Sequence, residues 1–395
     1  MASQTIIEAE IVAVPRVRRS FPFSKARRRL WAWTVAGEAY LASAVDWLFG
    51  LLALVLGLAI LAAIPLAQFL SLGYLLEASG RIGRTGRITA GLVGIRAASR
   101  VGSIVIGIWL LLLPLRWASN LWQSAVLIDP DSKAAHHWGI GVFVLGTLLA
   151  IHGISACWRG GRLRHFLLPV VNPRRVLRRL RRGRLYAEAR DAVWEFVMGL
   201  RLPYYFWLGL RGFIGGLLWL AVPVMLLADG QKSAAVGWVG AVLLMVVIVH
   251  LPLLQAHFAA ENRLRAMFEV RRVRRLFTQA PLAYWLAVSV TLLFALPLYL
   301  LKIEIIPREA AWLPSLIFVV FILPTRMVSG WAYARSVRHE QPRIWLSRHL
   351  SRLGMLPIAA LYVLILFFMQ YTAWNGVVSL YEQHAFLMPV PFLDL

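Results

Sequence analysis

Long runs without charge constrain this chain more than any other feature. The longest, residues 47–76, holds thirty residues without Asp, Glu, Lys or Arg, whereas a helix needs about 20 apolar residues to cross a bilayer. Over the whole chain 60% of the residues are hydrophobic and only 15% are charged, against roughly 25% in a soluble domain. These runs exclude a soluble globular fold and predict a membrane protein.

Apolar runs and charge breaks together predict an all-α fold, a polytopic transmembrane helical bundle of about eight spans. The spans are built as helical hairpins that are joined by basic cytoplasmic connectors. The predicted spans lie near residues 47–76, 101–122, 138–158, 212–228, 234–260, 280–301, 310–325 and 354–377.

The connections between these runs are of two kinds, arginine-rich and nearly neutral. The arginine-rich ones are residues 78–100, 159–211, 261–279 and 326–353. The short, nearly neutral ones are residues 129–137, 229–233 and 302–309. Because basic residues are retained in the cytoplasm, we expect a multi-pass protein of the bacterial inner (cell) membrane with its arginine-rich loops inside. The net charge of +24 has the same origin, so no nucleic-acid partner is expected.

The ends of the chain pose a conflict of charge. Residues 1–45 form a basic N-terminal segment, residues 46–377 the membrane domain, and residues 378–395 a short tail. Eight crossings with the basic connectors inside would export both ends, which disagrees with the basic N-terminal segment. We favour an interfacial helix followed by a hairpin or re-entrant element broken near Pro65, which keeps the N-terminus inside. The alternative is an exported N-terminus, and both place the tail outside.

A proline and a glutamine recur together near the ends of two apolar runs. IPLAQF at 64–69 aligns with LPLLQA at 251–256, and an acidic residue follows each; LPTRMV at 323–328 is a fainter echo without the glutamine or the acid. Polar sites in membranes form where helices are broken, because the freed backbone groups must line a cavity or be buried. The residues of the predicted polar or transport site are Gln68, Glu77, Gln255, His257 and Glu261.

The longest connector contains a predicted interfacial amphipathic helix near residues 172–200. Asn172 can cap this helix, with Pro173 at its first position. A basic amphipathic helix lies in the membrane interface and is attracted to anionic headgroups, although the same pattern could dock an acidic partner. The predicted lipid contacts are Arg174, Arg175, Arg178, Arg179, Arg181, Arg182 and Arg184.

Catalytic signatures are missing from the sequence. It contains no GxxxxGK[ST], HExxH, CxxC or GxSxG motif, and GRIGRTGR at 80–87 is expected to be a flexible cytoplasmic turn. The single cysteine, Cys157, rules out a disulfide within the chain. We therefore expect no cofactor, no metal and no enzymatic activity. For a membrane enzyme acting on lipid, His152 or His257 would be the only acid or base.

One part of the chain has a familiar pattern. A proline-ended helix leads into FLSLGYLLEASGRIGRTGRITAGLVGIRAASRVGSIVIGIWLLLLPLRW, residues 69–117, which joins a GYLL-type segment and a basic stretch to a second span. Over residues 64–117 the chain resembles an uncharacterised family of bacterial polytopic membrane proteins. The resemblance implies a class of membrane protein and no chemistry.

The predicted function is that of a scaffold or assembly component of the inner membrane, because the spans carry few polar groups. Its partners would be a bilayer with anionic headgroups and either another protein or a second copy of the chain. The alternative is a transporter or channel for a small solute, with the polar site lining its path.

Overall fold

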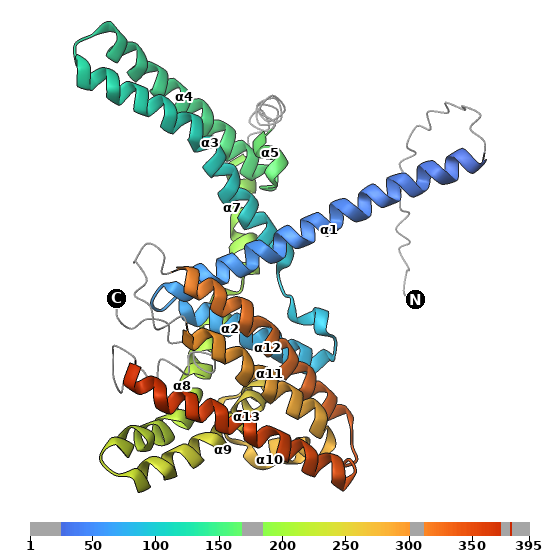
Figure 1. Cartoon of the computed structure of the whole chain (residues 1–395). Helices are drawn as coiled ribbons and strands as arrows, with labels where there is room; N and C mark the ends of the chain where they lie inside the picture. The colour runs from blue at the N-terminus through green and yellow to red at the C-terminus, as the bar shows by residue number, and fades with distance from the viewer. Residues whose placement is uncertain (1–24, 168–184, 301–311, 373–379, 381–395) are drawn as a thin grey trace, which may run out of the picture. The chain divides into compact units, whose positions relative to one another are not determined.

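The computed structural model describes residues 25–167, 185–300, 312–372 and 380 (Figure 1). Within these ranges all regular secondary structure is helical, which confirms the predicted all-α class. The chain divides into two compact units, residues 1–46 and 47–395. In chain order the helices are α1 Lys25–Ala63, α2 Gln68–Thr85, η1 Ile88–Gly91, α3 Ile95–Ile128, α4 Lys133–Trp158, α5 Leu163–Leu167, α7 Leu185–Gly199, α8 Leu202–Ala228, η2 Asp229–Gln231, α9 Ala234–Glu261, η3 Leu264–Phe268, α10 Val270–Gln279, α11 Pro281–Leu300, α12 Trp312–Arg338 and α13 Trp345–Thr372.

Seven of the described helices are long and apolar enough to cross a membrane, and up to eight segments qualify if a bent pair is one span. That pair is α10 with the first part of α11, bent by 115° where one helix ends and the next begins. The helices coincide with the apolar runs of the sequence, so the chain is a multi-pass transmembrane helical protein. Contact with the lipid bilayer follows from these spans.

The first apolar run is broken near Pro65, as predicted. α1 ends at Ala63 and α2 begins at Gln68. Proline lacks the N–H that would continue the helical ladder, and it disfavours helical dihedrals at the residue before it. The backbone of Leu66 is left-handed, with φ of 65°, which completes the change of direction. α1 itself runs without interruption from Lys25.

The second proline of the sequence match, Pro252, does not break a helix. Pro252 lies inside α9 and Pro324 lies inside α12, and both helices continue past their proline. Transmembrane helices tolerate proline where neighbouring groups satisfy the freed carbonyl. The sequence match between IPLAQF and LPLLQA therefore pairs a helix break with a helix interior.

A different repeat appears at the ends of α2 and α9. The C-cap residue of α2 is Gly86, with φ of 70°, and that of α9 is Asn262, with φ of 54°. Glycine and asparagine reach this left-handed conformation more easily than other residues. An extended arginine, Arg87 or Arg263, follows each cap and leads into a 3-10 helix, η1 or η3. The same helix-ending turn is thus built twice.

The GRIGRTGR segment is helical through Thr85, contrary to the predicted flexible turn. Packing explains the difference, because its glycines allow close approach of neighbouring helices. Gly80 lies against the backbone of Ala259 in α9, and Gly83 lies against the ring of Tyr333 in α12. Tertiary contacts have overridden the low helix propensity of glycine.

α2 is a central helix of the larger unit, packed against α8, α9 and α12 (Figure 1). Residues 71–80 are all buried. The closest approach is to α8, where Gly73 faces the backbone of Tyr205 and Gly209 faces the backbone of Phe69. Small residues at such crossings let transmembrane helices pack closely.

α3 and α4 form an apolar hairpin that also uses glycine for packing. Gly139, Gly146 and Gly153 recur every seven residues along α4, and the first two lie against Trp122 and Leu115 of α3. A seven-residue spacing keeps one face of a helix toward its partner. The opposite faces expose large apolar side chains, as expected of helices in contact with lipid.

Candidate functional site

Glu77 is a buried carboxylate on α2, and only 3% of the residue is exposed. It lies where α2 packs between α8, α9 and α12. A buried carboxylate is costly unless it is paired and hydrogen-bonded. The residues around Glu77 therefore form the candidate functional site.

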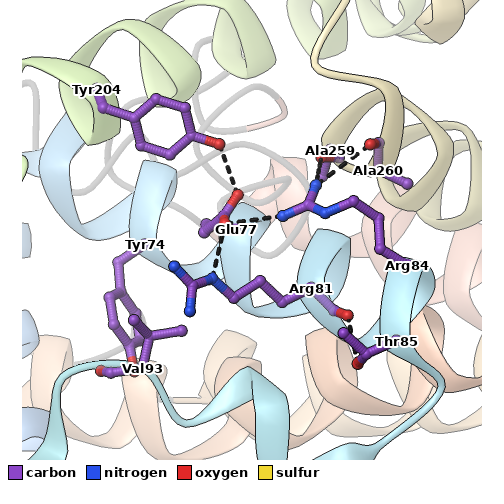
Figure 2. Close-up of polar contacts among 9 residues, drawn as sticks. All are labelled: Tyr74, Glu77, Arg81, Arg84, Thr85, Val93, Tyr204, Ala259 and Ala260. Carbon is purple, nitrogen blue, oxygen red and sulfur yellow. Dashed lines mark hydrogen bonds and ion pairs between the residues drawn. The ribbon is translucent and has the colours of Figure 1, made fainter. Parts of the chain in front are cut away.

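Three side chains satisfy Glu77 (Figure 2). Its Oε1 accepts from Nε of Arg81 at 2.9 Å and from Nη2 of Arg84 at 2.8 Å, and its Oε2 accepts from the hydroxyl of Tyr204 at 2.6 Å. Arg81 is one helical turn along α2, whereas Tyr204 comes from α8. The carboxylate thus joins α2 to α8 through charge-assisted hydrogen bonds.

Arginines also join the C-terminal ends of the central helices. Nη1 of Arg84 donates to the carbonyl oxygens of Ala259 at 3.0 Å and Ala260 at 3.2 Å, in the last turn of α9 (Figure 2). Arg338, at the end of α12, donates to the carbonyl oxygen of Thr85 at the end of α2. These carbonyls have no partner within their own helix, and a cation there also complements the helix dipole.

α9 carries a second set of polar residues, and each is engaged by a neighbour. Gln255 accepts a hydrogen bond from Nη1 of Arg326, a buried arginine of α12. Glu261 is paired with Arg263 at 2.9 Å and with Arg272 at 3.3 Å near the surface.

His257 is fully buried and forms a line with two other side chains. Its Nδ1 lies 3.0 Å from the hydroxyl of Tyr333, and its Nε2 lies 3.0 Å from Oε2 of Glu269. A neutral imidazole with its proton on Nε2 satisfies both contacts, because it accepts from the tyrosine and donates to the carboxylate. The line links α12, α9 and the start of α10.

The hydrogen bond from His257 holds the pKa of Glu269 below its ordinary value of 4.5, and the charges of Arg272 and Arg263 add to this lowering. A carboxyl group whose pKa is lower in the folded chain stabilises the fold fully above its unfolded pKa. That stabilisation is lost as the pH falls through the folded pKa. Glu269 therefore stabilises the fold at neutral and weakly acidic pH, and this stabilisation is lost in stronger acid.

Replacing Glu269 with glutamine is expected to lower the unfolding temperature by about 2 °C at neutral pH, because a charge-assisted bond becomes a neutral one. The difference from wild type should shrink as the pH falls below 4.5, the ordinary pKa of the carboxyl group. Thermal unfolding of the detergent-purified chain over this pH range measures both effects. A difference that stays constant into acid would contradict the assigned pair.

The predicted polar residues fall into three groups. Glu77 is connected to the end of α9 through Arg84, and Gln255, His257 and Glu261 lie along the second half of α9 itself. Gln68 is separate, because it begins α2, about 13 Å along the axis from Glu77. It is half-buried there.

The predicted lipid-binding arginines, residues 174–184, lie outside the described residues, and α7 represents the later part of their connector. His152 is buried against α5, with its Nε2 2.8 Å from the carbonyl oxygen of Phe166. The contact is of the kind that lets a histidine remain inside a bundle. This contact satisfies one ring nitrogen of His152 within the bundle.

Several members of these networks were not predicted from the sequence. They come from helices far along the chain from their partners, and the sequence around them does not predict the pairing: Tyr204, Tyr333 and Arg326. Arg326 is visible in the sequence as a charge within an apolar run. It lies two residues after the proline of LPTRMV, the match that lacks the glutamine and the acid. An arginine buried in a span is itself a candidate for function.

The fold and these networks define a multi-pass helical membrane protein whose central helices are joined by buried polar contacts. No protein-family model matches the chain, and neither the curated proteins nor the solved structures contain a match. In the described part of the chain, no group of three His, Cys, Asp or Glu side chains is placed to hold a metal ion.

Proposed function

We propose that the protein is a non-enzymatic scaffold or assembly component of the bacterial inner membrane. The observation that carries this proposal is the pairing of the polar residues. Glu77 binds Arg81, Arg84 and Tyr204, and Gln255 binds Arg326. Groups engaged in this way hold helices together, whereas a solute path needs groups that can turn to the solute.

The orientation that we propose places the ends of α2, α9 and α12 in the cytoplasm. The contacts of Arg84 with α9 and of Arg338 with α2 support one common level for these three ends. The segments that follow them carry the arginines of the sequence, and such segments stay inside. If α1 and α2 form the two legs of a hairpin at Pro65, the basic N-terminus is inside and the C-terminus outside.

A second candidate function, transport of a small solute or proton, is favoured by the line of Tyr333, His257 and Glu269. Histidine and carboxylate groups in series form proton relays in membrane proteins. Here the line begins at a buried tyrosine and ends at Glu269, whose side chain is 28% exposed. A relay of this kind would make the activity depend on His257.

The two functions are separated by flux and by assembly size, measured on one purified chain. For a scaffold, we expect proton uptake into proteoliposomes to equal that of protein-free liposomes, in wild type and in Glu77→Gln and His257→Gln alike. We also expect particles extracted directly from the membrane into polymer nanodiscs to contain more than one chain. A single-chain particle with an uptake that His257→Gln abolishes would replace the scaffold proposal with transport.

A further inference from the structure

The cluster around Glu77 carries more positive charge than its carboxylate can balance. Arg81 and Arg84 both bind Glu77. The guanidinium group of Arg201 lies over the ring of Tyr204, 4.9 Å from its centroid, and Tyr204 donates to Glu77. The contacts of this cluster thus bring together three arginines and one carboxylate, a formal excess of two positive charges among its described members.

The three arginines differ in which of their guanidinium nitrogens are available to a ligand. Arg84 is occupied, because one of its terminal nitrogens binds Glu77 and the other binds two carbonyl oxygens of α9. Arg81 binds Glu77 through Nε (Figure 2), and its two Nη atoms make no hydrogen bond within the described part of the chain. The Nη edge of an arginine presents two parallel N–H groups, which fit two oxygens of a phosphate.

Arg81 and Arg201 are connected through one short chain of contacts. Arg81 binds Oε1 of Glu77, and Arg201 lies over the ring of Tyr204, whose hydroxyl donates to Oε2 of the same carboxylate. The side chain of Arg81 is 35% exposed, and Arg201 is exposed. Arg201 also has a left-handed backbone, with φ of 53°, a strained conformation for a residue with a side chain. The two guanidinium groups are accessible; that of Arg81 is held by the buried Glu77, and that of Arg201 lies over the half-buried ring of Tyr204.

The surroundings of the cluster match the headgroup level of a membrane. The apolar part of α2 ends just before Glu77, and α8 begins with Tyr204, Tyr205 and Trp207, of which Trp207 is 58% exposed. Tyrosine and tryptophan concentrate where the hydrocarbon meets the headgroups. A phosphate held here would have apolar surface beside it for an acyl chain.

We propose that Arg81 and Arg201, oriented by Glu77 and Tyr204, bind the phosphodiester group of an anionic phospholipid. Basic pockets between transmembrane helices bind such headgroups. This site differs from the arginines of residues 174–184, which would meet the leaflet as a charged surface, because it is built from paired side chains of α2 and α8. It does not depend on whether the protein is a scaffold or a transporter.

The test uses the full-length chain in detergent and a fluorescent phosphatidylglycerol as the probe, with fluorescent phosphatidylcholine for comparison. We expect tighter binding of phosphatidylglycerol, and about a tenfold loss of its affinity in Arg81→Gln and in Arg201→Gln, as for one charge-assisted contact. The matched control is Arg265→Gln, which removes an exposed arginine from the turn after α9 and should change the affinity less than twofold.

Inorganic phosphate distinguishes the lipid from a free anion. Stabilisation by millimolar phosphate that matches stabilisation by phosphatidylglycerol, both lost in Arg201→Gln, would overturn the lipid assignment. Equal affinities of Arg201→Gln, Arg265→Gln and wild type for phosphatidylglycerol would overturn the site. Within the described residues the guanidinium group of Arg201 contacts only the ring of Tyr204, so this variant decides the outcome even if Arg81→Gln does not fold.

Discussion

Replacing Glu77 with glutamine is expected to destabilise the protein by about 2 kcal/mol. Removing one member of a buried ion pair costs about 3–5 kcal/mol, because the remaining charge is left without its partner. The side chains of Arg81 and Arg84 are 35% and 40% exposed, so water reduces this cost. Thermal unfolding in detergent, monitored by size-exclusion chromatography, measures the loss.

The matched control for Glu77→Gln is the same substitution at Glu261. Glu261 also binds two arginines, but its side chain is 29% exposed and those of Arg263 and Arg272 are 62% and 47% exposed. Exposed ion pairs contribute about 0–1 kcal/mol, so Glu261→Gln should have a small effect. Equal losses at the two positions would show that burial of Glu77 does not matter.

Replacing Gly73 with alanine is expected to destabilise the protein by about 3 kcal/mol, the larger of the two effects. A Cβ at Gly73 would collide with the main-chain carbonyl of Tyr205. Overpacked sites cost about 1–3 kcal/mol when side chains can adjust, and more when they cannot. Main-chain atoms cannot rotate away, so α2 and α8 would have to separate, which would also weaken the bond from Tyr204 to Glu77.

Gly57→Ala provides the control for Gly73→Ala. Gly57 is a helical glycine of α1, and among the described residues a Cβ there would meet nothing within 4 Å beyond the nearby backbone of its own helix. Alanine has the higher helix propensity by about 1 kcal/mol, so this variant should be as stable as wild type or slightly more so. The unfolding temperatures of both variants in one detergent give the comparison. If the two lose stability equally, the close crossing of α2 and α8 is not where the structure places it.

The helical class and the spans could be predicted because they depend on local sequence. An uncharged run of thirty residues has few soluble alternatives. The break at Pro65 is also local, since proline restricts its own residue and the one before it. Pro252 shows where this reasoning ends, because the neighbours packed around α9 decide whether the helix continues there.

The candidate site was predictable only in part. An acid at the end of a span can be recognised in the sequence as a charge beside an apolar run, as Glu77 and Glu261 are. Its partners cannot, because Tyr204 is 127 residues from Glu77 and Tyr333 is 76 residues from His257. Such pairs depend on which helices lie side by side. The helical conformation of GRIGRTGR also depends on tertiary packing, because its glycines pack against α9 and α12.

α2 and its neighbours form a closed interface held by polar contacts, and the scaffold proposal depends on this interface. Ser79 tests it directly, because it is 1% exposed and its backbone lies against Gly330 of α12. Ser79→Cys in a Cys157→Ser background should resist a small charged thiol reagent applied from either side of the membrane. Thr89→Cys, at an exposed position of η1, should be labelled readily. Equal labelling of the two cysteines would show that water reaches between α2 and α12, and would contradict the claim.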